Sequence, residues 1–323
     1  MARPVYLVDA SIYIFQAYFS PWQVVVAADE RDISAFHGYA RFLLRFLGQT
    51  KPQHVMAAFD ESLFCGFRHT LYAGYKANRE LPDDNLARQL SACARLTRLL
   101  GVSAFGSRNY EADDILGTVA ARARREGNHD ICVVSRDKDL AQLLHSDADH
   151  LWDFTGNRRR YARDILQQYG IRPDQFADYL GLVGDAIDSI PGVPGLGPVA
   201  ASCLLRHFES IPVLYQNLHE VPNLSYRGAK RGPELLRQHE EMARLSRTLA
   251  TIVQDVDHPD EPFSAIACRD LAWRDFDATA IDDLLATEGV DTLARERFME
   301  LVRGLAVARS RDACLQTAEE SDA

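Results

Sequence analysis

Two kinds of hydrophobic pattern alternate along the first half of the chain. Short apolar runs, rich in β-branched residues and each closing on an acid, cover residues 5–9, 54–60 and 131–137. Apolar positions at helical spacing cover residues 33–47, 86–100 and 112–125. Short apolar runs separated by helical stretches are typical of α/β proteins. The pattern therefore predicts an α/β fold with a parallel sheet flanked by helices.

The acids that end these runs are Asp9, Asp60 and Asp137. A single strand that ends in Asp is unremarkable, because Asp often opens a turn. Three in succession are harder to explain as turns. The carboxyl ends of parallel strands meet at one edge of a sheet, where functional groups gather. We therefore expect the three carboxylates to converge.

A denser acidic stretch, Glu111-Ala-Asp113-Asp114, opens one of the helical patterns. Acids are favourable at a helix N-terminus, where free N–H groups and the dipole are positive, so a plain acidic first turn is the simpler explanation for this stretch alone. Three carboxylates exceed what a cap needs, however, and crowded carboxylates repel unless a cation lies among them. Hard divalent cations prefer such oxygen ligands.

Three further acids lie downstream. Asp139 follows Asp137 by two residues, and Asp185 and Asp188 are spaced so that they can share one face of a helical turn. Isolated carboxylates in the crevice of a sheet would be costly. A site for two cations would remove that cost and would support two-metal phosphoryl chemistry.

Residues 62–84 mix basic and aromatic side chains, with Arg68, Tyr75, Lys76 and Arg79 at their centre. Basic groups bind phosphates, and aromatic faces stack on unpaired bases. The alternative is a long surface excursion with a solvated charged face. The neighbouring carboxylates would have to accept a polyanion, and this favours contact between residues 62–84 and a single strand.

A glycine-rich stretch, Gly192-Val-Pro-Gly195-Leu-Gly197, lies between two helical patterns. Glycines let backbone amides approach phosphates, and the N-terminus of the following helix adds a positive dipole. A plain linker between helices is the alternative explanation. The helical patterns of this part of the chain cover residues 174–183, 198–208 and 233–252.

A net charge of −10 would ordinarily argue against a nucleic-acid partner. Residues 259–323 hold 7 basic and 15 acidic residues, however, so the rest of the chain is near neutral despite its clustered acids. Six cysteines without a Cys-x-x-Cys pair indicate reduced thiols in a cytoplasmic protein, and neither a disulfide frame nor a zinc site. No apolar run reaches the length of a membrane span, and the N-terminus does not read as a signal peptide.

Together these segments resemble the 5′-nuclease, or flap endonuclease, family, which includes the 5′-nuclease domain of bacterial DNA polymerase I and stand-alone 5′-3′ exonucleases. The resemblance runs from Asp9 to about Val256. The motifs that carry it are Val8-Asp9, Ala58-Phe-Asp60, Phe67-Arg68, Tyr75-Lys-x-x-Arg79, Tyr110-Glu-Ala-Asp-Asp114, Ser135-Arg-Asp-Lys-Asp139 and Gly184-Asp-x-x-Asp188-Ser-Ile-Pro-Gly-Val-x-Gly-Leu-Gly197.

The resemblance implies two divalent-cation sites, filled by Mg²⁺ in most members, with Mn²⁺ as the alternative. It assigns the first site to Asp9, Asp60, Glu111 and Asp113, with Asp114 between them. It assigns the second to Asp137, Asp139, Asp185 and Asp188. It also implies that residues 62–84 form a helical arch that admits a 5′ single strand. Lys76 and Arg79 would then be catalytic residues near the scissile phosphate, and Arg68 and Tyr75 would contact DNA. Gly192, Gly195 and Gly197 would belong to a helix–three-turn–helix element that holds duplex DNA, often with a bound K⁺.

Three residues depart from the family pattern. Gln16, Ser189 and Val199 stand where the family commonly has Arg, Asn and Lys. Every acid of the motifs is present, so we expect weaker DNA affinity without loss of catalysis.

These observations predict three regions: a PIN-like α/β nuclease domain over residues 1–170, a helix–three-turn–helix domain over residues 171–258 and an acidic helical extension over residues 259–323. The predicted function is a metal-dependent 5′→3′ exonuclease or 5′-flap endonuclease that acts on DNA as a monomer and leaves 5′-phosphorylated products. Two alternatives stay open. One is a structure-specific DNA-binding protein with little turnover, and the other is an RNA-directed nuclease.

Overall fold

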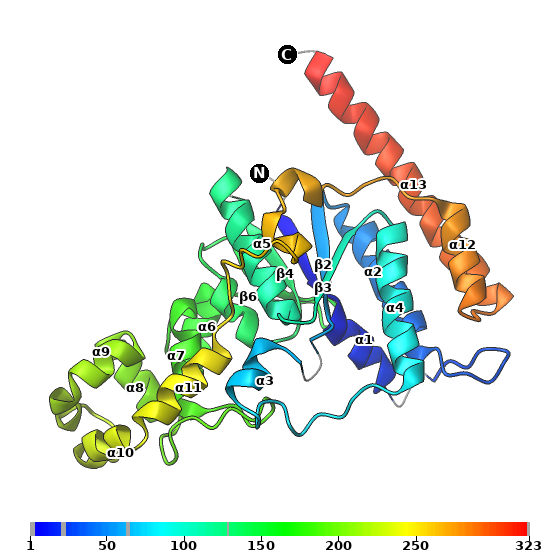
Figure 1. The fold of residues 1–323 in the computed structure, drawn as a ribbon. Coiled ribbons are helices and arrows are strands. Elements are labelled where there is room, and N and C mark those ends of the chain that lie inside the picture. The colour runs from blue at the N-terminus through cyan, green and yellow to red at the C-terminus, as the bar shows by residue number, and fades with distance from the viewer. Residues whose placement is uncertain (1–3, 21–23, 63–64, 128, 322–323) are drawn as a thin grey trace. The chain divides into compact units, whose positions relative to one another are not determined.

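The computed structural model describes residues 4–20, 24–62, 65–127 and 129–321 (Figure 1). The chain divides into two compact units that are each assembled from separate stretches of sequence. The first unit contains residues 1–59, 82–105 and 266–323, and the second contains residues 60–81 and 106–265. None of the helices in these described stretches is long and apolar enough to cross a membrane.

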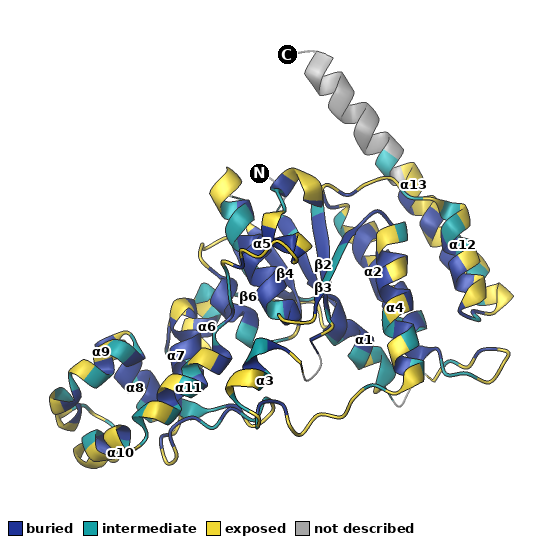
Figure 2. Ribbon diagram, viewed as in Figure 1, coloured by how far each residue is buried: buried dark blue, intermediate teal, exposed yellow. Residues whose placement is uncertain are grey.

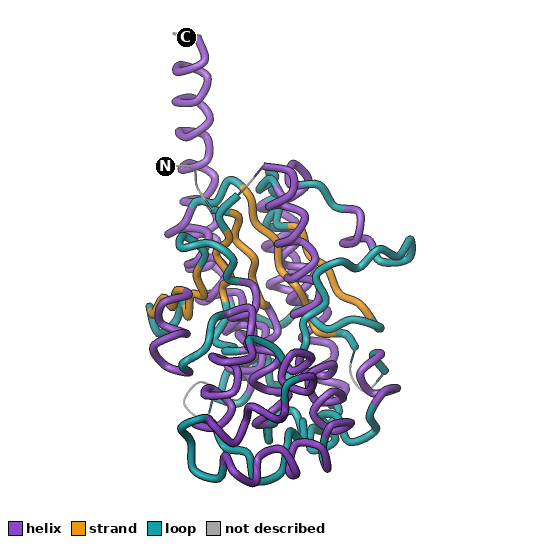
Figure 3. Tube along the Cα trace, turned by 90° about the vertical axis from the view of Figure 1, so that its left-hand side faces the viewer, coloured by secondary structure: helices purple, strands orange, loops and turns teal. Residues whose placement is uncertain are grey.

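Six short strands form one sheet in the order β3-β2-β1-β4-β5-β6, drawn in orange in Figure 3. The strands are β1 (Val5–Asp9), β2 (His54–Asp60), β3 (Ser103–Ser107), β4 (Ile131–Val134), β5 (His150–Asp153) and β6 (Arg158–Tyr161). β1 pairs with β2 and β4 with β5 in parallel, whereas β6 runs antiparallel to β5. The predicted α/β sheet is confirmed, but it is mixed and not purely parallel. Sequence patterns missed β3, β5 and β6 because these strands, SAFGS, HLWD and RRRY, contain no continuous apolar run.

The first unit covers its strands with long helices whose buried faces are dark blue in Figure 2. Its helices are α1 (Ala10–Tyr18), α2 (Ser34–Thr50), α4 (Asp84–Leu99), α12 (Ala278–Thr287) and α13 (Thr292–Ser321). Within the core, the Tyr39 hydroxyl lies 2.8 Å from Thr97 Oγ1 and joins α2 to α4. Arg88 on α4 pairs with Glu288 beyond α12, and the Trp273 Nε1–H donates to the Leu100 carbonyl at 2.8 Å. The acidic C-terminal segment is therefore part of this core.

The second unit carries the remaining helices. They are α3 (Phe67–Leu71), α5 (Ala112–Gly127), α6 (Ala162–Tyr169), α7 (Phe176–Val183), α8 (Pro198–Phe208), α9 (Ile211–Gln216), α10 (Gly232–Gln238) and α11 (Glu240–Ala250). α7 packs against α8 and α11, where Asp178 accepts from Arg247 Nε at 2.8 Å and from the Ile211 amide at 2.9 Å. The predicted helix over 233–252 is wrong in one respect, because it breaks at His239, whose backbone leaves the helical region.

Residues 62–84 contain less helix than an arch implies. In the described part of this segment, α3 is the only helix before α4 begins, and turns and irregular backbone fill the rest. Residues 63 and 64 lie outside the described residues. Gly66, Gly74 and Pro82 interrupt the segment, and each is a poor residue for a helix interior.

Candidate active site

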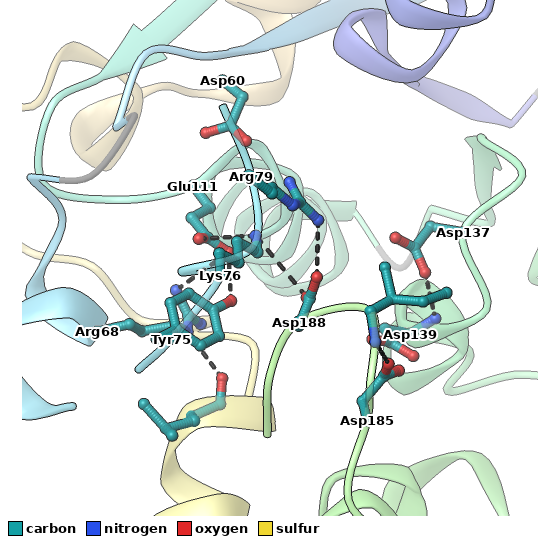
Figure 4. A network of polar contacts seen from close by, with 12 residues as sticks. Asp60, Arg68, Tyr75, Lys76, Arg79, Glu111, Asp137, Asp139, Asp185 and Asp188 are labelled. Atoms are coloured by element: carbon teal, nitrogen blue, oxygen red, sulfur yellow. Dashed lines mark hydrogen bonds and ion pairs between the residues drawn. The ribbon is translucent and has the colours of Figure 1, made fainter. Parts of the chain in front are cut away.

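Asp60, Glu111 and Asp188 form what we call the first carboxylate group, in the second unit (Figure 4). Asp60 ends β2, Glu111 precedes α5, and Asp188 lies in the loop after α7. Lys76 lies among them, with its Nζ 2.8 Å from Glu111 Oε1 and 3.8 Å from Asp188 Oδ2. Arg79 Nη2 donates to Asp188 Oδ1 at 2.7 Å. Two cationic side chains from residues 62–84 therefore neutralise acids that come from separate elements.

Within the first carboxylate group, the surroundings shift the pKa values of Asp60 and Glu111 in opposite directions. Burial raises the pKa of Asp60, and the nearby Glu111 carboxylate raises it further. Burial opposes ionisation of Glu111 as well, but the Lys76 ammonium and the Arg68 guanidinium hold its pKa below the usual value. Glu111 is therefore an anion with fixed partners, whereas the ionised form of Asp60 is under-compensated.

Asp137, Asp139 and Asp185 form the second carboxylate group, on the other side of Figure 4. Asp137 follows β4, Asp139 opens a 3₁₀ turn, and Asp185 follows α7. Lys138 Nζ lies 2.6 Å from Asp185 Oδ2 and 2.9 Å from Asp139 Oδ1. The Asp139 amide donates to Asp137 Oδ1 at 2.9 Å. Burial and the neighbouring Asp137 carboxylate raise the pKa of Asp139 to about 7.

The resemblance grouped Asp188 with this second group, but the ion pairs of Asp188 are with Lys76 and Arg79 of the first. Asp185 and Asp188 share a tight turn in which the Asp185 and Ile190 backbones exchange two hydrogen bonds of 2.8 Å. The Asp188 carbonyl also accepts from the Lys76 amide at 3.0 Å. The turn therefore presents one acid to each group.

Asp114 and Arg68 do not fit the roles that the resemblance assigned to them. Both side chains are buried, and Arg68 Nη1 and Nη2 donate to the two oxygens of Asp114 at 2.6 and 2.7 Å. Arg68 also donates to the Leu249 carbonyl, and the same carboxylate accepts from the Glu111 and Val253 amides. These buried hydrogen bonds make the pair an internal clamp that joins α3 and α5 to the end of α11. The predicted roles of Asp114 as a metal ligand and of Arg68 as a DNA contact are therefore corrected: the two residues bind each other.

Tyr75 also differs from its prediction as a stacking platform for DNA bases. It is only 3% exposed, and its hydroxyl donates to Glu111 Oε2 at 3.0 Å. Its ring lies beside the Lys76 ammonium at 5.1 Å from the ring centroid. A buried ring cannot stack on a base, so the correction is that Tyr75 orients Glu111 and Lys76.

The remaining predicted ligands are described separately. Asp9 belongs to the first unit, where it is buried at the end of β1 and its Oδ1 caps α1 by accepting from the Ile12 amide at 3.3 Å. Asp113 lies half-buried in the first turn of α5. In the described part of the chain, no three of the candidate side chains are drawn together closely enough to form a ready metal cluster. In both carboxylate groups, basic side chains lie between the acids.

The glycine-rich turn contains two kinds of glycine. Gly192 has φ of +65° and packs against Gly184, so closely that a Cβ there would meet the Gly184 amide nitrogen. Its own amide donates to Ser246 Oγ at 2.9 Å. Gly195, with φ of +84°, and Gly197 have open space where a Cβ would lie. Gly192 therefore shapes the turn, and only the other two present their backbone outward.

Gly195 and Gly197 line a cavity of about 260 Å³ at the start of α8. Tyr226 and Arg227, from the loop before α10, line the same cavity. Val199 lines it as well and is 76% exposed, so its side chain does not pack into the helix core. Sequence patterns do not single out Arg227, because the glycines that share its cavity lie far from it along the chain.

Ser189 and Gln16 are the other two residues that differ from the family pattern. Ser189 has φ of +56°, a left-handed conformation that Asn tolerates better than Ser. The family's usual Asn at this position would therefore relieve strain in the turn. Gln16 is exposed on α1 of the first unit.

Comparison with known proteins places the chain. The model of the "5′-3′ exonuclease, N-terminal resolvase-like domain" matches residues 4–170, and the model of the "5′-3′ exonuclease, C-terminal SAM fold" matches residues 171–277. The chain belongs to the 5′-3′ exonuclease family. Membership in this family confirms the predicted class of enzyme, a nuclease, and the predicted α/β domain followed by a helical region.

The chain is also similar to individual known proteins. The chain is 35% identical over 215 residues to the flap endonuclease Xni of Serratia proteamaculans, covering 66% of this chain and 82% of that protein. It is 35% identical over 260 residues to DNA polymerase I of Bacillus caldotenax, covering 79% of this chain but 28% of the polymerase. Its fold is similar to T5 5′-exonuclease with bound divalent zinc ions, at a TM-score of 0.61 and 17% identity, covering 93% of this chain and 99% of that one.

Proposed function

We propose that the protein is a divalent-metal-dependent nuclease that hydrolyses DNA phosphodiester bonds at a 5′ end or 5′ flap and leaves 5′ phosphates. The observation that carries the proposal is the pair of carboxylate groups in one unit, each held by basic side chains, in a chain of the 5′-3′ exonuclease family. Oxygen-rich, partly buried acids suit hard divalent cations, and the basic side chains suit phosphates.

The residues present fit such cations. All donors are carboxylate oxygens, and among the described residues Asp139 Oδ1 is a buried oxygen that makes no hydrogen bond of normal geometry. Its ion pair with Lys138 leaves hydrogen-bonding capacity unused, and a bound cation would satisfy that oxygen. We assign one cation to Asp60, Glu111 and Asp113 and the other to Asp137, Asp139 and Asp185. Asp9, which belongs to the first unit, and Asp188, which pairs with Lys76 and Arg79, stay predicted ligands. Mg²⁺ is the proposed ion and Mn²⁺ the alternative, in keeping with the divalent zinc ions bound to T5 5′-exonuclease.

When bound, divalent cations would supply an activated water and charge stabilisation for phosphodiester hydrolysis. The chain's own residues would orient the substrate. Lys76 and Arg79 are held near Glu111 and Asp188, so their charges lie where a phosphate would approach. Tyr75 fixes the Glu111 carboxylate through its hydroxyl. Lys76 and Arg79 would stabilise negative charge as it develops on the phosphate.

The turn at Gly195 and Gly197 is the proposed contact for duplex DNA. Its outward backbone, the N-terminus of α8 and Arg227 surround one cavity, and each favours a phosphate. A K⁺ ion bound at this turn is part of the same proposal. The division at residues 170 and 258, and action as a monomer, also stay predictions.

One cleavage assay tests the proposed function. A 5′-flap duplex labelled at its 5′ end should be cut in Mg²⁺ or Mn²⁺, should stay intact in EDTA, and should be cut far faster than its 3′-flap mirror. Binding of the flap duplex without cleavage under any metal would instead indicate a structure-specific binding protein. Preferential cleavage of RNA would indicate the RNA-directed alternative.

A further inference from the structure

Lysine is rare in this chain, and its placement is uneven. The 36 basic residues include only four lysines, at positions 51, 76, 138 and 230. Two of these four, Lys76 and Lys138, bridge the acids of the two carboxylate groups. An arginine presents a rigid fork that pairs strongly with one carboxylate, whereas a lysine presents a compact, rotatable ammonium on a flexible stem. One position in each carboxylate group therefore carries the more easily displaced cation, and Arg79 is a further cation in the first group.

Lys138 is the clearer case, because neither the proposed chemistry nor DNA binding uses it. It joins two acids that lie 46 positions apart in sequence: Asp139 on its own turn and Asp185 after α7. Its side chain is 33% exposed, so the ammonium can leave for solvent without disturbing a packed core. The pair formed by Arg68 and Asp114 is the contrast, because both side chains there are buried and the pairing is bidentate.

One ammonium does not balance the second carboxylate group. The group contains three acids, and Lys138 pairs with two of them, Asp139 and Asp185. The Asp137 carboxylate accepts from the Asp139 amide instead. Asp139 Oδ1 is 2.9 Å from Lys138 Nζ yet lacks a hydrogen bond of normal geometry within the described structure. The arrangement therefore leaves both charge and hydrogen-bonding capacity that a cation of higher charge could satisfy.

We propose that Lys138 is an exchangeable counter-ion: it holds Asp139 and Asp185 together in the metal-free protein and is displaced when a divalent cation binds to the second carboxylate group. The inference rests on the proposed function, since it presupposes a cation at this group. Its consequence is that Lys138 lowers the affinity of the site while it stabilises the metal-free fold. Lys138 is thus a positioning residue and not a ligand.

The test measures metal binding without DNA and without turnover. Mn²⁺ is titrated into purified protein, and the concentration of free Mn²⁺ is measured by electron paramagnetic resonance. Lys138→Met removes the charge and keeps most of the length of the side chain, and it should tighten the weaker class of Mn²⁺ sites by about tenfold. Lys138→Arg should weaken that class. Lys51→Met, the same change at an exposed lysine of the first unit, should leave it unaltered.

Removing the charges of both partners assigns the effect to the second carboxylate group. In an Asp139→Asn, Asp185→Asn background, Lys138→Met should change Mn²⁺ affinity little, because both ion pairs of Lys138 are already broken. The melting temperature gives an independent readout: Lys138→Met should lower it in EDTA, and Mn²⁺ should restore it by more than in the wild type.

An unchanged or weaker Mn²⁺ affinity in Lys138→Met, with the wild type still binding Mn²⁺ and cutting a 5′ flap, would overturn the displacement alone. Lys138 would then be a fixed clamp or a phosphate contact. A wild-type protein that neither binds Mn²⁺ nor cuts the flap would overturn the proposed function itself. The two failures are therefore distinguishable.

Discussion

Neighbouring residues of one motif have different surroundings in this protein. Asp113 and Asp114 are adjacent in the first turn of α5, yet Asp113 is half-buried, whereas Asp114 is fully buried and forms an ion pair with Arg68. The side chains of adjacent helical residues point about 100° apart, so one can face a site while the next faces the core. An acidic motif can therefore contain both ligands and structural anchors.

Matched amide variants separate these roles. Asp114→Asn should lower the free energy of unfolding by about 3–5 kcal/mol, because it leaves the buried Arg68 guanidinium uncompensated. Asp113→Asn should leave stability unchanged or raise it in metal-free protein, because carboxylate repulsion falls, while flap cleavage falls by orders of magnitude. Denaturant unfolding and flap cleavage, measured on both variants, check the pair. Equal stability of the two variants would contradict the clamp, and near-normal turnover by Asp113→Asn would remove Asp113 from the ligands.

Lys76 allows a second test at the scale of a single residue. Its Nζ contacts Glu111 inside the first carboxylate group, and it is not an exposed charge. Lys76→Ala should lower the single-turnover rate by at least about tenfold and change duplex binding by less than about twofold, because its charge matters most as negative charge develops on the phosphate. Lys51→Ala is the control. A change in binding with an unaltered saturated rate would make Lys76 a plain phosphate contact.

At the scale of an element, the turn between α7 and α8 has a closely packed part at Gly184 and Gly192 and an exposed part, which we call the rim, at Gly195 and Gly197. Gly184 and Gly192 cross at close range with positive φ, which only glycine adopts without strain, and Ser246 ties Gly192 to α11. Gly195 and Gly197 have free space above them. Stability and DNA contact are therefore assigned to different glycines of one motif.

Alanine at each kind of glycine should show this division. Gly192→Ala places a Cβ against backbone at positive φ, so it should destabilise the protein by about 3 kcal/mol or more. Gly197→Ala meets open space at φ of −89° and should leave the melting temperature within a degree or two, while duplex binding weakens. Thermal melting and fluorescence anisotropy with a duplex check both variants. Weak duplex binding by a stable Gly197→Ala supports the rim, and unaltered binding by that variant would place the duplex elsewhere.

Val199 offers a gain-of-function test of the same element. Because its side chain is exposed beside the cavity, Val199→Lys should fold normally and add about one phosphate contact. The log–log dependence of duplex affinity on salt should then steepen by roughly 0.9, with tighter binding at low salt. Cleavage polarity should not change, since the carboxylate groups are untouched. An unchanged slope would mean that α8 does not face the duplex.

At the scale of the molecule, chain order and compact units do not coincide. The first unit is assembled from both ends of the sequence, and residues 266–323 complete a core begun by residues 1–59. Trp273 illustrates this closure: its amide donates to the Gln53 carbonyl at 3.0 Å and its indole to the Leu100 carbonyl, while Arg309 covers the ring. The acidic segment therefore has a packing role regardless of any partner.

Trp273→Ala should lower the free energy of unfolding by about 3–5 kcal/mol, because it opens a cavity and leaves the Leu100 carbonyl without its donor. Arg269→Ala, at an exposed arginine of the same segment, should stay within about 0.5 kcal/mol of the wild type. Denaturant unfolding of the full-length chain compares them. A Trp273→Ala protein as stable as the control would mean that the segment is an appendage and not part of the core.

The sequence by itself determined the α/β class, the strands β1, β2 and β4, the family and the candidate acids, because periodicity and motif spacing are local properties of the chain. Only the tertiary structure decided which of those residues face a site. Arg68 donates to a carbonyl 181 positions away. The Gly192 amide donates to Ser246, 54 positions away, and Lys138 pairs with Asp185, 47 positions away. The antiparallel β6 and the return of the C-terminal segment to the first core are likewise pairings between distant stretches. Burial and ion pairing depend on such distant partners, so local pattern cannot distinguish a ligand from an anchor within one motif.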